Sequence, residues 1–435
     1  MPKLSPDVVG AVAADPPSWR AARPEPIAEP RVHKWLALAL GLLVAWAAYM
    51  YATQFANGLG VTGLNRPVFW GIYIANFIFC VGLSAGGIAV SALVHLLERQ
   101  DMKPVAIMAE VMATSLLALA GTFIIIDLGQ PTRLLFVFRS PNFSSPLLWD
   151  VTAISSYMLL CLALLYFSAR SVLIEQRSRG KWRWLVRVFT LGHMSLSERA
   201  RRWDHRLLRT LAIISIPGAV ALHSVTAWIL GLVKGQPGWN TPILAPLFIA
   251  SALVSGLAGV LLAVIAGRKL FKLEVAQDVV LSLARYLLAL IPVLAYLLFS
   301  EFLTVGYSGT PVHLQVLHEI LFGRFARIFW FDIIVGVVIP VGLLGLPWTR
   351  NSTRAIALAC GLVIVGVFAE RTYVLLPSLM RPALGPGVAA YGPTAVEWSI
   401  MAGAYALGLL LFTALMALLF GFRFEGLPVR ARYVR

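Results

Sequence analysis

The sequence predicts an all-α integral membrane protein with about ten transmembrane helices. Of its 435 residues, 59% are hydrophobic and only 13% are charged, whereas about 25% of the residues in soluble domains are charged. The apolar residues gather into ten runs, each close to the roughly 20 residues that a helix needs to cross a bilayer. A water-soluble fold has no use for so much apolar surface.

The ten apolar runs define the predicted spans. They cover residues 35–55, 69–97, 106–128, 148–169, 208–233, 243–266, 279–303, 326–346, 353–376 and 396–421. Residues 1–34 have no apolar core, so we expect an N-terminal cytoplasmic tail and no signal peptide. Residues 422–435 form the C-terminal tail. The long basic connection 170–207 is expected to be a solvated loop or, alternatively, to lie on anionic lipid.

The distribution of basic residues predicts the orientation. With the N-terminus inside, 27 of the 36 Lys and Arg residues fall in inner segments and seven in outer segments. Inner loops of membrane proteins are enriched in Lys and Arg, so both termini are expected in the cytoplasm. The net charge of +16 then reflects topology, and nucleic acid is not expected as a partner.

The second predicted span has a stripe of polar and small residues on one helix face. The stripe comprises Tyr73, Asn76, Cys80, Ser84 and Gly87. Gly82 and Gly86 form a GxxxG motif, which allows another helix to approach closely. We therefore expect this helix to lie at the centre of the bundle.

Ionisable residues inside predicted spans are candidate functional residues, because each costs roughly 2.5–3.5 kcal/mol on insertion scales. In or near the outer halves lie Asp127, His223, Glu301, Asp332, Glu370, Arg371 and Glu397. The inner halves contain Glu110, Asp278 and Arg285. These three fit the inner end of a proton path or, equally, a structural ion-pair network. The polar chemistry is thus biased toward the outer side.

The chain is expected to carry no haem, iron–sulfur cluster or metal ion of its own. Its cysteines, Cys80, Cys161 and Cys360, lie singly in apolar runs and form no CxxC or CxxCH motif. Of the seven histidines only His223 is deep in a span, so no pair at one depth is available for a bis-histidine haem.

Several segments resemble a known family. They are RPVFWGIYIANFIFCVGLSAGG (66–87), IIIDLGQPTRLL (124–135), SPNFSSPLLWDVTAISSY (140–157), ALHSVTAWILGLVKGQPGWNTPILAPLFIASALVSG (221–256), FSEFLTVGYSG (299–309) and YGPTAVEW (391–398). Over nearly all of 60–420 the chain resembles the NrfD / polysulfide-reductase membrane-subunit family. It is most similar to the ten-span branch of hydrogenase, sulfite-reductase-linked and alternative complex III assemblies.

The resemblance implies two four-helix bundles, at 69–233 and 243–376, with the spans 35–55 and 396–421 peripheral. It implies a quinone-reactive subunit of a bacterial inner-membrane oxidoreductase, whose substrate is menaquinol or ubiquinol. Such subunits exchange electrons with a periplasmic ferredoxin-like iron–sulfur subunit and further redox subunits, and some are candidates for proton translocation.

For the site, we expect Asp127 to accept a proton from quinol, with His223 as a hydrogen-bonding or relay partner. The further candidate quinone contacts are Tyr73, Asn76, Ser84, Arg66 and Arg133. A proton path would use Glu110, Asp278, Arg285, Glu301, Glu370 and Arg371. The chain departs from the family at Gln130, where Arg is frequent, and at Ser84, where alternative complex III relatives carry His.

Two other functions fit the sequence. Ten helices with buried charges also suit a secondary transporter, and the chain could be a structural anchor for a periplasmic oxidoreductase. Solute uptake by the chain alone would indicate a transporter, and failure to bind a quinone analogue would indicate an anchor.

Overall fold

The ten predicted spans are present as helices. The computed structural model describes residues 32–177, 183–233, 235–270, 275–381 and 389–420, so both tails and part of the basic loop lie outside the described residues. Within these ranges ten helices are long and apolar enough to cross a membrane. They are α1 (Val32–Asn57), α2 (Ile72–Leu96), α3 (Lys103–Asp127), α5 (Pro146–Arg177), α7 (Glu198–Gly231), α8 (Leu244–Leu270), α9 (Gln277–Ser308), the run of α11, η6 and α12 described below, α13 (Thr353–Met380) and α14 (Ala395–Phe420).

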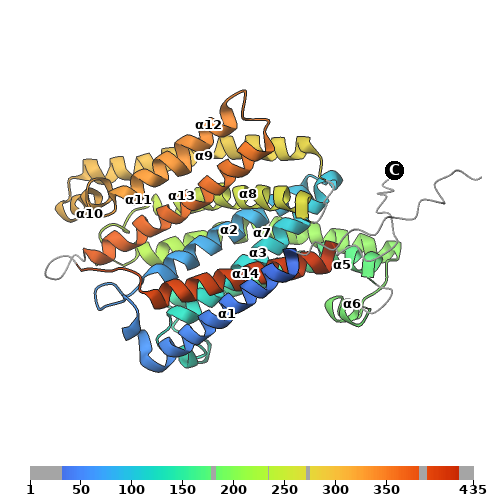
Figure 1. Ribbon diagram of the computed structural model, residues 1–435, viewed down its shortest axis with the longest axis horizontal. Helices are drawn as coiled ribbons and strands as arrows, with labels where there is room; N and C mark the ends of the chain where they lie inside the picture. Colours follow the sequence, from blue (N-terminus) through green and yellow to red (C-terminus); the bar gives the residue numbers. More distant parts are fainter. Residues whose placement is uncertain (1–31, 178–182, 234, 271–274, 382–388, 421–435) are drawn as a thin grey trace, which may run out of the picture.

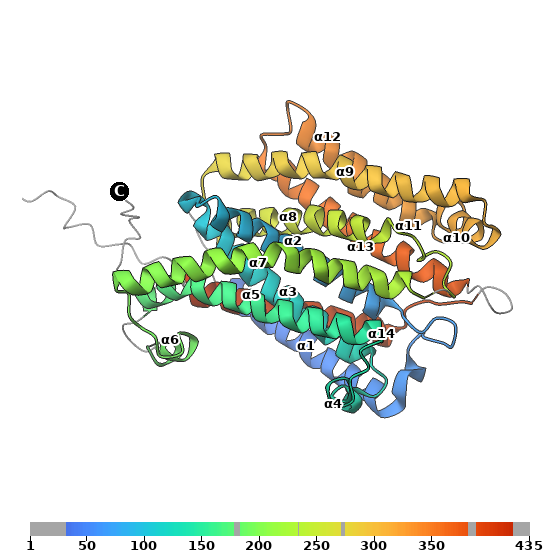
Figure 2. The same cartoon turned by 180° about the vertical axis from the view of Figure 1, so that it is seen from behind.

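Short helices cover the two ends of the bundle. They are η3 (Gly58–Val61), η4 (Gln100–Met102), η5 (Pro131–Arg133), α4 (Phe136–Arg139), α6 (Arg183–Phe189) and α10 (Pro311–Leu321). Helices α6 and α10 lie at opposite ends (Figures 1 and 2). We call the end with α10 the predicted outer end, because the distribution of basic residues predicts that orientation.

Helix α2 lies at the centre of the bundle, where it contacts α3, α7, α8 and α13. Most of its residues are buried. A Cβ atom at Gly86 would collide with the backbone of Ala252 and Gly256 in α8, so the two helices touch backbone to backbone. The predicted close helix approach is therefore confirmed at Gly86, whereas a Cβ atom at Gly82 would make only ordinary contacts.

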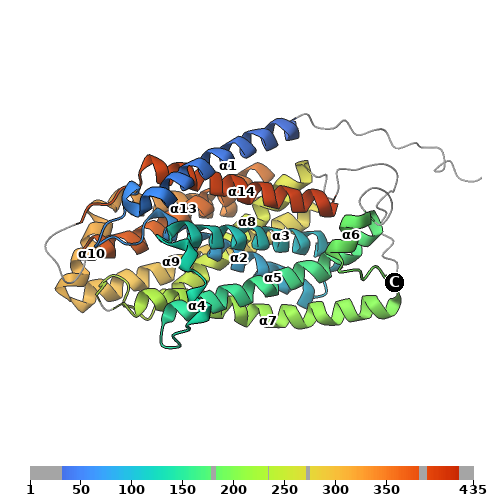
Figure 3. The same ribbon diagram turned by 90° about the horizontal axis from the view of Figure 1, so that it is seen from below.

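Helices α1 and α14 pack against each other along one side of the molecule (Figure 3). Most side chains of α1 are exposed to the surroundings of the chain, as expected of a helix that faces lipid. Helices α2, α3, α5 and α7 contact one another, and so do α8, α9, α12 and α13. The division into two functional bundles remains a prediction, since α2 also packs closely against α8.

The eighth span changes its winding halfway. It consists of α11 (Ala326–Phe331), the π-helical segment η6 (Asp332–Val338) and α12 (Ile339–Gly345). A Cβ atom at Gly336 would meet both the Asp332 carboxylate and Gly366 of α13. The two glycines thus leave room for a carboxylate between helices, and π segments are frequent at functional sites. The sequence predicts the extent of this span but not its change of winding.

Gly86→Ala is expected to destabilise the protein by about 1–3 kcal/mol, because the added methyl group has no space against the α8 backbone. Gly121→Ala is the matched control, since a Cβ atom there meets nothing within 4 Å and Ala favours a helix. Thermal unfolding in detergent measures both variants. Equal unfolding temperatures would contradict the close α2–α8 contact.

Candidate functional site

The first candidate site lies at the predicted outer end, where α1, α2 and α3 meet. The Tyr73 hydroxyl donates to Oε1 of Gln54 at 2.9 Å, and Nε2 of Gln54 donates to the Ile126 carbonyl at 2.8 Å. Asp127 follows directly and ends α3. Its Oδ1 atom is buried, and no hydrogen-bond partner lies near it in the described part of the chain. A carboxylate oxygen in this state is ready to accept a proton or a hydrogen bond from a ligand.

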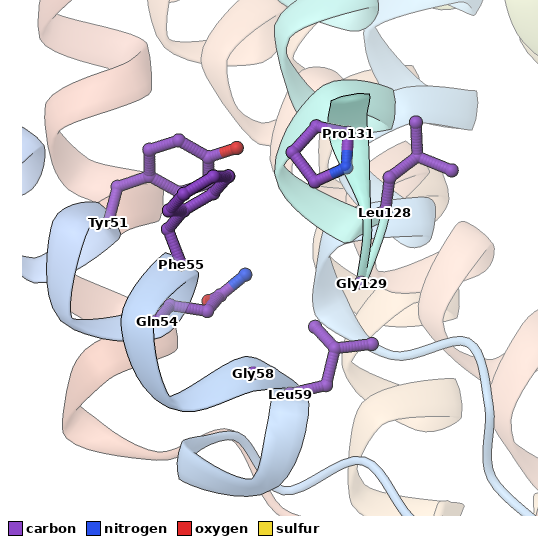
Figure 4. Close-up of a pocket in the computed structure, with 8 residues that line it drawn as sticks. All are labelled: Tyr51, Gln54, Phe55, Gly58, Leu59, Leu128, Gly129 and Pro131. Carbon is purple, nitrogen blue, oxygen red and sulfur yellow. The ribbon is translucent and has the colours of Figure 1, made fainter. Parts of the chain in front are cut away.

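A pocket is lined in part by Leu128 and Gly129, the two residues that follow Asp127 in the chain (Figure 4). It encloses about 190 Å³ of empty space, including its open mouth, and is lined by Tyr51, Gln54, Phe55, Gly58, Leu59, Leu128, Gly129 and Pro131. Tyr51 and Gln54 extend from α1 toward the segment after α3. The Phe55 side chain is 57% exposed, so the pocket opens beside a helix surface that faces lipid. Its lining offers both apolar and polar contacts.

Glu397, in the first turn of α14, is fully buried at the predicted outer end. It accepts hydrogen bonds from the backbone N–H groups of Gly63 and Thr394 at 2.8 and 2.9 Å, and from the Tyr391 hydroxyl at 2.8 Å. Burial raises the pKa of Tyr391, so this phenol remains a donor at neutral pH. Glu397 joins two loops to α14 and is best explained by that structural role.

Three of the predicted quinone contacts are already paired within the protein. Asn76 accepts a hydrogen bond from the Tyr405 hydroxyl at 2.5 Å and donates to the Ile72 carbonyl. Ser84 donates to the Ala113 carbonyl at 2.9 Å, which joins α2 to α3. Tyr73, as described above, is bonded to α1. These side chains hold helices together, and Tyr73 is the one nearest the pocket through Gln54.

The predicted basic contacts lie on the surface. Arg66, in the loop before α2, and Arg133, in η5, are both exposed. No described interaction joins either guanidinium to Asp127. Their position at the predicted outer end suits contact with another protein better than tuning of a buried carboxylate.

His223 lies away from Asp127, at the interface of α7 with α2 and α8. Its Nδ1 faces the Ala219 carbonyl at 3.0 Å, and its Nε2 is buried without a partner among the described residues. The Nε2 atom points toward Gly82, which is nine residues, or about 14 Å, along α2 from Tyr73. The structure therefore separates the two residues that the sequence analysis assigned to quinol oxidation.

A buried charged cluster, here called the Arg371 centre, surrounds this position. It comprises His223 (α7), Phe248 and Ser251 (α8), Asp332 (η6), and Glu370, Arg371 and Tyr373 (α13). The guanidinium carbon of Arg371 lies 4.1 Å from the centroid of the Phe248 ring, and Nη1 is 3.5 Å from Oε1 of Glu370. Glu370 accepts from Ser251 at 2.6 Å, and Asp332 accepts from Tyr373 at 2.8 Å.

Glu301 lines a second pocket at the predicted outer end and accepts a hydrogen bond from Thr241 at 2.7 Å. The pocket encloses about 380 Å³ of empty space, including its mouth. It is lined by Gly238, Leu244, Leu247, Leu298, Glu301, Phe302, Val316, Ile320, Tyr373, Val374 and Ser378. Tyr373 also belongs to the Arg371 centre, so the two features share a wall.

The predicted inner residues do not form one network. Glu110 is fully buried and faces Ser91, His95 and Ser168 at 2.6, 2.9 and 2.9 Å, in a cluster between α2, α3 and α5. Asp278 and Arg285, on α9, are exposed, and the recorded partner of Arg285 is Ser282 on its own helix. The expected alignment of Glu110 with Asp278 and Arg285 is not seen.

Gln54 and the roles of Tyr391, Tyr405 and Asp332 are not predicted from the sequence. Gln54 could have been found as the lone amide near the end of an apolar span, because a buried amide in a membrane needs a partner. The other three depend on contacts between helices far apart in the sequence. Among the described residues, no group of three or more His, Cys, Asp or Glu side chains is placed to hold a metal ion.

Helix α10, which covers the second pocket, is held by an ion pair. The Arg381 guanidinium donates to Oε1 of Glu319 at 2.6 and 3.1 Å, and the Arg324 N–H donates to Oε2 at 3.2 Å. Burial would by itself raise the pKa of Glu319, but these bonds and the two positive charges outweigh it, so the pKa lies below its ordinary value of 4.5.

Glu319→Gln is expected to lower stability by about 1 kcal/mol at neutral pH. Because the folded-state pKa is lowered, the stabilisation is complete above pH 4.5 and is lost as the pH falls through the folded value. Thermal unfolding at a series of pH values tests this. The exposed Glu198→Gln is the control; a difference from wild type that does not shrink in acid would contradict the ion pair.

Comparisons with known proteins agree on one family. Residues 60–383 match the family described as polysulphide reductase, NrfD. A Halobacterium salinarum protein, provisionally named as a dimethyl sulfoxide reductase membrane subunit, is 30% identical, over 87% of this chain and 89% of its own. A selenate reductase subunit of Mesobacillus selenatarsenatis is 28% identical, over 83% and 88%. The Hdr-like menaquinol oxidoreductase integral membrane subunit of Archaeoglobus fulgidus is 26% identical, over 87% and 91%.

Proposed function

Because the chain belongs to the NrfD family of polysulphide reductase membrane subunits, we propose that it is the quinone-reactive subunit of a reductase complex in a bacterial cytoplasmic membrane. In this proposal it exchanges electrons between membrane quinol and a ferredoxin-like iron–sulfur subunit on the outer face. One similar protein is named as a subunit of a menaquinol oxidoreductase, which supports menaquinol as the substrate.

The observation that carries the proposal is the unpartnered carboxylate oxygen of Asp127, whose chain neighbours Leu128 and Gly129 line a pocket that opens beside the exposed Phe55 of α1. A quinol is carried in the bilayer, so its site needs a side entrance between helices. The exposed Phe55 and the half-buried Tyr51 on α1 form that entrance. A structural anchor alone would not require a buried oxygen to be left without a partner.

The chemistry is a two-electron, two-proton exchange. When quinol is oxidised, one hydroxyl proton passes to Asp127, and the Gln54 amide can hold the ring oxygen. Tyr73 fixes the Gln54 side chain through its hydrogen bond. The two electrons would pass to the partner subunit, and Asp127 would release the first proton to the outer side before it accepts the second. The same steps in reverse reduce quinone, and the partner's potential sets the direction.

The partner subunit is proposed to dock on the segment between α3 and α5 together with the first turn of α5. Large apolar side chains are exposed there, namely Leu135, Phe136, Phe138, Phe143, Leu147 and Trp149. The exposed Arg133 and Arg139 lie among them. Aromatic residues and Arg are enriched at protein interfaces, and this surface lies directly beyond Asp127 in the chain. Electron transfer at short range needs that proximity.

The transporter alternative is not adopted, because no described observation favours a solute site over a quinone site. We keep Glu301, Glu370 and Arg371 as candidates for a proton path. Asp278 and Arg285 are exposed, and their described contacts do not connect them to these three residues.

Asp127→Asn is expected to lower quinol oxidation by the assembled complex at least about 100-fold, because an amide cannot accept the proton. Asp101→Asn is the matched control, since Asp101 is exposed at the opposite end and pairs with Arg99. Turnover with a quinol analogue and an artificial electron acceptor measures both. Turnover of Asp127→Asn close to that of wild type would remove Asp127 from the mechanism.

A further inference from the structure

The Arg371 centre contains several buried polar atoms without hydrogen-bond partners in the described ranges. They are Nε, Nη1 and Nη2 of Arg371, Oε1 of Glu370 and Nε2 of His223. Arg371 is 1% exposed, Glu370 2% and His223 4%. Two helices, α7 and α13, thus direct unsatisfied donors and acceptors into one small region inside the bundle, against α8.

Such a group of orphaned atoms points to bound water. Buried polar groups in proteins are almost always hydrogen-bonded, and where protein atoms do not serve, ordered water does. A guanidinium has five N–H donors, and here its face is taken by the Phe248 ring. No described group hydrogen-bonds the remaining edge of the guanidinium, so bound water would complete its hydrogen bonds and those of Nε2 of His223.

The charges of the centre do not balance when all groups are ionised. Arg371 contributes one positive charge, whereas Glu370 and Asp332 contribute two negative charges. Asp332 lies within electrostatic range of both Glu370 and Arg371. A net charge is costly inside the bilayer, so the centre is neutral when the two carboxylates share one proton.

The helices around Asp332, the second carboxylate of the centre, leave space for its side chain. The π-helical turn begins at Asp332, and Gly336 and Gly366 leave room for its side chain. The Tyr373 hydroxyl donates to Asp332 at 2.8 Å. Gly336 and Gly366 also let the two helices touch backbone to backbone, but that contact does not require a carboxylate between them, and π-helical segments are frequent at functional sites.

A route leads from the centre toward the predicted outer end. Tyr373 separates the centre from the pocket that contains Glu301. That pocket also holds the Ser378 hydroxyl, which is buried without a described partner. The pocket therefore has polar groups that can bind water on the way to Glu301.

We propose that the Arg371 centre binds a cluster of internal water molecules together with one exchangeable proton, which moves between Asp332 and Glu370. The proton reaches the predicted outer end through Tyr373 and the Glu301 pocket. His223, which is not in contact with the pocket near Asp127, belongs to this water cluster. The proposal rests on the proposed function only in that quinol turnover would drive the proton through the centre.

Infrared spectroscopy of the assembled complex tests the shared proton directly. The wild-type spectrum should contain a protonated carboxylic acid band that shifts in D₂O. Asp332→Asn and Glu370→Gln should each lose this band, because the remaining carboxylate then pairs with Arg371 and ionises. Glu319→Gln is the control and should keep it. Survival of every such band in both variants, or no shift in D₂O, would overturn the proposal.

A second measurement needs no substitution. A high-resolution cryo-electron microscopy map of the unmodified complex should show water within hydrogen-bond distance of Arg371 and of Nε2 of His223. A dry centre, with the guanidinium paired directly to both carboxylates, would overturn the proposal even if the variants failed to fold.

Proteoliposome assays separate this proposal from the proposed function. Wild-type complex should oxidise quinol and release more protons on the outer side than the one per electron that quinol itself supplies, and Glu370→Gln should lower this ratio to about one per electron. Quinol oxidation with an unchanged proton ratio in Glu370→Gln would contradict the relay and leave the quinone site intact. A wild-type complex that binds no quinone analogue would instead contradict the proposed function.

Discussion

The cost of leaving a polar group without a partner in a lipid bilayer governs the arrangement of these helices. Most buried polar side chains in the described ranges avoid this cost through hydrogen bonds that join one helix or loop to another. Asn76 bonds to Tyr405 of α14, Ser84 to α3, and Tyr73 to Gln54 of α1. Several other buried polar atoms also lack partners, but the largest group of such atoms in the described ranges lies in the Arg371 centre, and Asp127 is a further case. Function is best sought at these exceptions, because packing does not explain them.

Helix α2 connects the region of Asp127 with the Arg371 centre, because it packs against helices that carry residues of both. The backbone contact of Gly86 with Ala252 and Gly256 brings α8 against α2, and α8 in turn presents Phe248 and Ser251 to the Arg371 centre. Helix α2 also packs against α3, which ends at Asp127. A change at the proposed quinone site would reach the centre through α2 and α7, without any direct contact between Asp127 and His223.

The sequence predicted the ten spans because hydrophobic length is a local property, and the close helix contact because GxxxG is a local pattern. It also located Asp127, Glu301, Glu370 and Arg371 as buried ionisable groups. It did not predict their partners, since these come from helices far apart in the sequence. The π-helical turn at Asp332 was missed because it depends on a glycine in α13, and the exposure of Asp278 and Arg285 depends on how α9 is rotated.

The most direct test of the account is a structure of the complex with a bound quinol analogue. The account predicts that the ring lies between α1 and the segment after α3, with a ring oxygen within hydrogen-bond distance of Asp127 or Gln54. A ring bound instead in the Glu301 pocket, or a pocket near Asp127 closed by apolar side chains, would contradict it.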